Sequence, residues 1–197
     1  MNIEKSGNEP QIEKEITPSK SAEGLLKSLP NRSGNDIVEI GLDEGNDPLF
    51  FAKENNNVFV VESRDSLIEK AQTKAEEIGV TEKIKFQRLE RHSALTLDRE
   101  ENTVDGVHSI AFLNGTVLSK SIEEIARVLK PHGKAVILIY ESTLEENGQE
   151  KRWFRENTIE EASIKANLEI DEKIEFLDPR HENKTKVNVY YLTKKSN

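Results

Sequence analysis

Two glycines and a carboxylate carry the strongest chemical signal in this sequence. A short apolar run, 37–40, leads into a turn that contains Gly41 and Gly45, and a helical pattern follows at once. A second apolar run, 58–61, ends in Glu62. This order of strand, glycine turn, helix, strand and acidic residue is typical of sites that hold a nucleotide-like ligand at the end of a parallel sheet. The turn lets backbone approach the ligand, and the carboxylate accepts hydrogen bonds from ribose hydroxyls.

The glycine spacing argues against two other nucleotide sites. A dinucleotide fingerprint that starts at Gly41 requires glycines at Asp43 and Asn46, and neither is present. A P-loop requires Gly-Lys-Ser/Thr, and no such sequence follows Gly45. The turn is therefore predicted to serve a different nucleotide-like ligand.

Composition and charge limit the class of protein. The chain has 197 residues, which favours one domain, and 35% hydrophobic against 33% charged residues indicates a small core in a heavily solvated shell. The net charge of −9 argues against general nucleic-acid binding. The absence of cysteine excludes disulfides, thiolate metal sites and a cysteine nucleophile. No signal peptide or membrane-spanning run is visible, so we expect a cytoplasmic protein without membrane contact.

The elements that must position the turn alternate along the chain. Residues 1–18 are polar and are predicted to be a flexible tail, and 19–197 a single domain that begins with a helix at 19–29. Strands are predicted at 37–40, 58–61, 84–89, 104–110, 135–140, 168–176 and 186–192, and helices at 48–53, 66–78, 119–129 and 158–166. This order predicts an α/β fold with a doubly wound, mostly parallel seven-stranded sheet and a C-terminal antiparallel hairpin.

Two segments resemble the class I S-adenosylmethionine-dependent methyltransferases, in particular the small type 11 group. Residues 122–134 look like that family's helix, turn and fifth strand, with His132 in a position that is usually glycine. Residues 102–107 look like the entry to its fourth strand. The resemblance covers roughly residues 37–192. It implies a Rossmann-like methyltransferase fold and S-adenosylmethionine as the cofactor.

The family's first motif reads acidic-x-Gly-x-Gly-x-Gly. Glu39, Gly41 and Gly45 match it. Asp43 replaces the middle glycine, and Glu44 adds a second negative charge. A side chain at position 43 takes up room beside the methionine part of the cofactor; its carboxylate would repel the cofactor's carboxylate and attract its amino group and sulfonium. The resemblance therefore implies weakened cofactor binding here.

The resemblance places further cofactor contacts at strand ends. Glu62 matches the acidic residue that holds both ribose hydroxyls, and Ser63 lies where the adenine edge is expected. Glu90 resembles the residue that accepts a hydrogen bond from the adenine amino group, although a solvated loop residue is an equal alternative. Arg91 would offer backbone to the adenine ring, and Ser109 falls close to the methionine moiety.

Methyl transfer from a sulfonium demands little of the protein, because alignment of the reacting atoms does most of the work. A base is needed only if the nucleophile must lose a proton. Among the four histidines, His108 is the leading catalytic candidate, with core packing or a backbone hydrogen bond as the alternative. No histidine pair has metal-ligand spacing, so no metal is predicted.

Substrate recognition is expected in the variable segments, and one of them is distinctive. The run 151–155 is basic and aromatic inside an acidic chain, so it either binds an anionic or planar substrate or anchors a loop to the core. The acidic run 145–150 is predicted to be a solvated loop. The leading hypothesis is methyl transfer to an unidentified small-molecule or protein acceptor. The alternative is a non-catalytic scaffold or partner subunit that has lost cofactor binding. A protein partner is compatible with both hypotheses.

Overall fold

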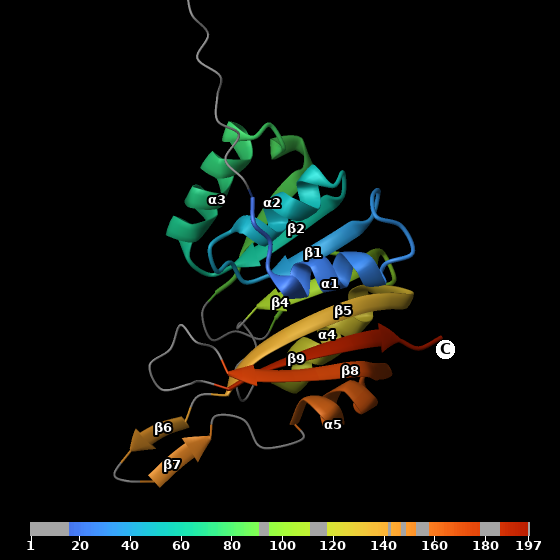
Figure 1. The fold of residues 1–197 in the computed structure, drawn as a ribbon. Coiled ribbons are helices and arrows are strands. Elements are labelled where there is room, and N and C mark those ends of the chain that lie inside the picture. Colours follow the sequence, from blue (N-terminus) through green and yellow to red (C-terminus); the bar gives the residue numbers. More distant parts are fainter. Residues whose placement is uncertain are drawn as a thin grey trace, which may run out of the picture.

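One seven-stranded sheet organises the protein in a computed structural model (Figure 1). The strand order is β3-β2-β1-β4-β5-β9-β8. The first five strands are parallel, and β9 pairs antiparallel with both β5 and β8. The structure describes residues 16–90, 95–110, 118–141, 143–146, 149–152, 158–177 and 186–196. The predicted doubly wound sheet with a C-terminal hairpin is confirmed.

Most elements fall close to their predicted ranges. The helices are α1 (Lys20–Ser28), α2 (Asn46–Lys53), α3 (Asp65–Glu77), α4 (Leu118–Val128) and α5 (Thr158–Lys165), with a 3-10 turn η1 (Thr81–Lys83). The strands of the sheet are β1 (Asp36–Ile40), β2 (Asn57–Glu62), β3 (Ile84–Arg88), β4 (Val104–Ile110), β5 (Leu129–Glu141), β8 (Leu168–Leu177) and β9 (Lys186–Lys194). Within the described part of the chain, no helix is both long enough and apolar enough to cross a membrane.

The segment after β5 differs from the prediction. A separate antiparallel pair, β6 (Thr143–Glu146) and β7 (Gln149–Arg152), occupies the run that was predicted to be a solvated loop at 145–150. That prediction was wrong because Leu144 is the only apolar residue in these two segments, so the sequence gives no alternating signal. Of the basic and aromatic run, 151–152 belong to β7, and 153–155 lie outside the described residues.

Two layers of helices enclose the sheet. Helices α1, α2 and α3 pack on one face, and α4 and α5 pack together on the other, each layer with its own apolar core. β1 is the middle one of the five parallel strands, and its last four residues are all buried, as expected for a strand covered on both sides. The glycine turn that follows β1 therefore lies in the middle of the carboxyl edge of the sheet.

The start of β5 is irregular. The strand begins before the predicted range, and its register with β4 shifts between Val104 and Gly106. His132 has φ 65°, in the left-handed region that favours glycine, which agrees with its place in a usual glycine position. Gly133 is needed for a different reason, because an added Cβ would come within 2.9 Å of the Lys130 carbonyl oxygen.

Replacing His132 with glycine is expected to stabilise the fold. Glycine adopts positive φ without steric cost, and it loses part of that gain to the greater entropy of the unfolded chain. We expect the free energy of unfolding to rise by about 0.5 kcal/mol, measured by urea denaturation. Gly133→Ala is the control, and it should lower the free energy of unfolding, because the added Cβ would clash with the Lys130 carbonyl oxygen. A destabilised His132→Gly variant would contradict the strain argument.

Candidate active site

The turn after β1 obtains its shape from two glycines. Gly41 has φ 86° and Gly45 has φ 76°, both in the left-handed region. Gly45 is also the N-cap of α2, the residue directly before the helix. Asp43 is not among the described non-glycine residues with positive φ, so it replaces the family's glycine without backbone strain. The Asp43 side chain therefore affects ligand binding only through the room it takes up and its negative charge.

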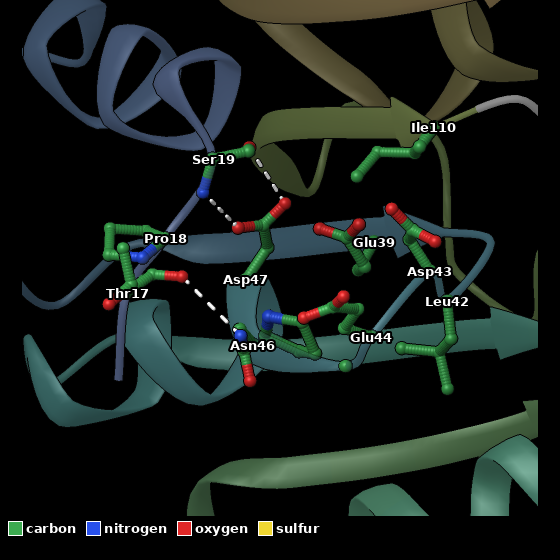
Figure 2. A pocket seen from close by; sticks show the side chains of 12 residues that line it. Thr17, Pro18, Ser19, Glu39, Leu42, Asp43, Glu44, Asn46, Asp47 and Ile110 are labelled. Atoms are coloured by element: carbon green, nitrogen blue, oxygen red, sulfur yellow. Dashed lines mark hydrogen bonds between the residues drawn. The ribbon is translucent and has the colours of Figure 1, made fainter. Parts of the chain in front are cut away.

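A cavity of about 190 Å³ opens at this turn. Four carboxylates contribute to its wall: Glu39, Asp43, Glu44 and Asp47. Figure 2 shows the side chains of Glu39, Asp43 and Asp47 turned toward the same space. The other lining residues are Thr17, Pro18, Ser19, Leu42, Gly45, Asn46, Pro48 and Ile110, and none of them is basic. The concentration of negative charge favours a ligand that carries positive charge.

A second cavity, of about 280 Å³, lies at the opposite end of the strands. Asp36 and Asn57, the first residues of β1 and β2, line it together with Lys83 and Arg99. Ligands of open parallel sheets bind outside the carboxyl ends of the strands. The smaller cavity is therefore the better candidate for the active site.

Behind the acidic wall, a buried network ties α1 to the sheet. His108 Nδ1 lies 2.9 Å from Glu39 Oε2, and its Nε2 lies 2.9 Å from Ser21 Oγ. Ser19 reaches Asp47 with both its backbone N–H, at 2.7 Å, and its hydroxyl, at 2.8 Å (Figure 2). His108 is fully buried, and Glu39 is 1% exposed. His108 therefore supports the cavity wall from inside, so the core alternative describes its position better than a catalytic role does.

The same network contains a set of side chains that could hold a metal ion. Ligand atoms of Glu39, Asp47 and His108 lie within 4.8 Å of one another. Each of the three nevertheless hydrogen-bonds to protein: Glu39 to His108, Asp47 to Ser19, and His108 also to Ser21. These bonds account for the cluster without an ion, and the expectation of no metal stays a prediction.

Burial and charge shift the pKa values of Glu39 and His108. Burial raises the pKa of Glu39 to about 7, although His108 opposes the rise. Burial lowers the pKa of His108, but the charge and hydrogen bond of Glu39 outweigh it, so the pKa is raised overall. Both groups therefore bind protons more tightly in the folded protein than in the unfolded chain.

The free energy of unfolding is expected to fall as the pH rises from about 5 to about 8, because the folded state binds more protons than the unfolded state in that range. The stabilisation from protonated His108 is complete below its unfolded pKa and is lost as the pH passes its raised folded value. Urea denaturation at several pH values measures this slope. Glu39→Gln should flatten it, and stability that increased over this range would contradict the assignment.

Glu62 is oriented into the protein. Its carboxylate is 2% exposed and does not line the cavity. It accepts hydrogen bonds from the backbone N–H groups of Leu42, Ser63 and Arg64, at 2.7–2.9 Å. The Arg64 guanidinium contacts both carboxylate oxygens and the Leu42 carbonyl. Burial raises the pKa of Glu62, but these hydrogen bonds outweigh it and the pKa is lowered, so Glu62 is a carboxylate held by its own chain.

The other predicted cofactor residues are dispersed. Ser63 directs its hydroxyl to Glu62 rather than to the cavity. The Glu90 side chain is 82% exposed and pairs with Arg88, which agrees with the solvated alternative. Ser109 is fully buried, and its hydroxyl has no hydrogen-bond partner in the described structure. Arg91 lies outside the described residues.

The structure thus brings together part of the predicted set and adds members to it. Glu39, Asp43 and Gly45 meet at the cavity. Asp47 and Arg64 were not among the predicted site residues. Asp47 lies in the first turn of α2 and Arg64 lies two residues after Glu62. Their closeness to the motif in the sequence could have identified them as site residues. Their hydrogen-bond partners could not have been predicted from the sequence.

Comparisons with known proteins agree with this architecture. Residues 37–133 match a family described as a methyltransferase domain. The chain is 33% identical over 133 residues to phosphoethanolamine N-methyltransferase 1 from Triticum aestivum. That alignment covers 65% of this chain and 25% of the relative, so the chain spans about a quarter of the relative's length.

Solved structures share the fold at low sequence identity. Geranyl diphosphate methyltransferase in complex with SAM has a TM-score of 0.71 and 14% identity, with 88% of this chain and 84% of that chain covered. The cyclase SpnF has a TM-score of 0.72 and 15% identity, with 89% and 80% covered. These likenesses concern the fold alone. The matched domain is described as a methyltransferase domain, and the fold agrees with the class I methyltransferase fold that the sequence predicts.

Proposed function

We propose that the chain binds S-adenosylmethionine at the carboxyl end of β1 and transfers its methyl group to an acceptor. The observation that carries the proposal is the acidic cavity at the glycine turn, where Glu39, Asp43 and Asp47 converge. The cofactor presents two positive groups, an ammonium and a sulfonium, which suit a wall of carboxylates. A similar structure is described in complex with SAM, which supports the choice of cofactor.

An amine is the acceptor that best suits this cavity. A protonated amine is attracted by the same carboxylates, and the wheat relative is named as an N-methyltransferase. An amine must lose its proton before it can attack the methyl group, and Glu39, whose pKa is raised to about 7, lines the wall with a value suited to that task. The acceptor can be a small molecule or a side chain of a protein.

A non-catalytic role is the second candidate, because one observation favours it. The carboxylate expected to hold the ribose is occupied by Arg64 and three backbone N–H groups. The ribose hydroxyls must compete with these donors. A chain in which they fail to do so would keep the fold as a scaffold or partner subunit without turnover.

Calorimetric titration with S-adenosylmethionine and with its demethylated product separates the two candidates. Binding of either ligand supports the enzyme, and radiolabelled methyl transfer to a panel of amines and matched alcohols then tests the acceptor class. The absence of heat and of a thermal shift at millimolar ligand would remove the enzyme. Turnover of alcohols alone would reject the amine and leave the cofactor assignment intact.

Asp43→Gly tests the role of the extra carboxylate. If Asp43 attracts the cofactor's cationic groups, the glycine variant should bind S-adenosylmethionine about three- to tenfold more weakly, because a partly exposed charge interaction contributes about 1 kcal/mol. Calorimetry measures the change. Lys53→Gly, outside the cavity lining, controls for a general effect of a new glycine. Tighter binding by Asp43→Gly would show that the side chain obstructs the site and would favour the scaffold.

A further inference from the structure

The outer edge of the sheet at β8 is exposed along most of its length. Among the described strands, β8 pairs only with β9, and none of residues 169–177 is buried. Ile174, Phe176 and Leu177 are 40%, 44% and 56% exposed, and they are three of the four exposed large apolar side chains in the described structure. An exposed edge strand with apolar side chains is a template for pairing with another strand.

The two faces of β8 differ in chemistry. Ile174 and Phe176 lie opposite Val189 and Val187 of β9, on the sheet face whose apolar core includes α1. Lys173 and Glu175 belong to the other face, where Lys173 Nζ lies 3.0 Å from Glu175 Oε1. The only register shift in β8 comes earlier, between Ile170 and Glu172, so the strand is regular where these side chains lie.

This part of β8 is complementary to itself. In an antiparallel pair of two copies related by a twofold axis at Ile174, Lys173 of each copy faces Glu175 of the other, and Ile174 packs against its own copy. Opposite charges at facing positions stabilise a strand pair, and like charges destabilise it. Registers centred one residue to either side set Lys173 or Glu175 against itself. Charge therefore disfavours both neighbouring registers.

We propose that β8 is a homodimer interface, in which a second copy of this chain pairs antiparallel with β8 about an axis at Ile174. The sheet then continues from one copy into the other. The contact is isologous, because the same residues serve both copies. It covers the apolar side chains of Ile174 and Phe176 and places each Lys173 between two Glu175 carboxylates, one from its own chain and one from its partner. The interface does not depend on the proposed methyl transfer.

Sedimentation equilibrium of the full chain over a wide concentration range tests the interface. The wild type is expected to form a dimer. Lys173→Glu and Glu175→Lys each set like charges opposite each other and should weaken the dimer at least about tenfold. The double charge reversal restores opposite charges and should return the dissociation constant to within about threefold of the wild type. Lys85→Glu, the same change on the opposite edge strand β3, should have no effect.

Each variant is checked by thermal denaturation, because Lys173 also contacts Glu160 and Glu175 also contacts Lys186 within one chain. Two independent single reversals keep the test decisive if one of them fails to fold. A wild type that is monomeric at every concentration would overturn the proposal and leave this edge to a strand of another protein. A dimer indifferent to both reversals, or not restored by the double reversal, would overturn it as well.

Discussion

Replacing His108 with leucine is expected to lower the free energy of unfolding by about 3–5 kcal/mol. The imidazole is fully buried and pairs with Glu39 at 2.9 Å. Its removal takes away the partner that holds the pKa of Glu39 down, so Glu39 must either take up a proton or remain an unpaired buried charge. Asp47, whose carboxylate lies 3.9 Å from His108, adds a second negative charge nearby. At about 2–4 °C per kcal/mol for a chain of this size, the melting temperature should fall by roughly 6–20 °C, measured by calorimetry.

The double variant Glu39→Leu/His108→Leu is the matched control. Removal of both members of a buried pair leaves no orphan charge, and apolar side chains of similar volume often replace such pairs at little cost. The double variant should therefore recover most of the stability lost by His108→Leu. The single variant should also lose less at low pH, because protonation of Glu39 removes the unpaired charge. A loss below about 1 kcal/mol at neutral pH would show that the pair is not ionised.

Replacing Glu62 with glutamine is expected to weaken S-adenosylmethionine binding by about ten- to a hundredfold. The resemblance assigns this carboxylate to the ribose hydroxyls, and a hydrogen bond to a charged group contributes about 1.5–3 kcal/mol. The amide also donates where the carboxylate only accepts, so it is a poor partner for the N–H groups of Leu42 and Ser63. Calorimetry measures the affinity, and a melting curve shows whether the variant is folded.

Replacing Arg64 with alanine should have the opposite sign. The Arg64 side chain is 49% exposed and bonds to the same carboxylate, so the ribose must displace it or share Glu62 with it. A partly exposed ion pair contributes about 1 kcal/mol or less, and its removal should tighten cofactor binding by up to about fivefold. Arg32→Ala removes an exposed ion pair with Glu54 far from the turn and should leave the affinity unchanged. If Arg64→Ala bound the cofactor with unchanged or weaker affinity, the ribose would not be a ligand of Glu62.

Much of the fold was readable from local patterns. The periodicity of apolar residues located the helices and strands of the sheet within two positions, except for the start of β5, because an element buried on one or both faces must repeat at its own period. The polar hairpin β6–β7 was missed because nothing in it is required to be apolar. The positive φ of His132, which explains why glycine is usual at its position, became visible only in the structure.

The position of the candidate site could be predicted from the sequence, but the hydrogen bonds within it could not. Glu39, Asp43 and Gly45 were predicted to contact the cofactor on motif order, and in the structure they line the same cavity. The orientation of Glu62 depends on Arg64 and on Leu42 from the neighbouring strand's turn, and no spacing rule encodes that choice. Ser19 and Ser21 reach the site because α1 folds back over the sheet.

The sequence by itself determined the order of elements and the end of the sheet at which a ligand can bind, because local periodicity and glycine placement act over a few residues. The tertiary structure alone decided which charged groups are neutralised. His108 meets Glu39 across 69 positions of the chain, and Ser21 meets His108 across 87. Such pairs form only when packing brings two distant strands and a helix into contact, and the free energy of a buried charge depends on the partner that packing provides.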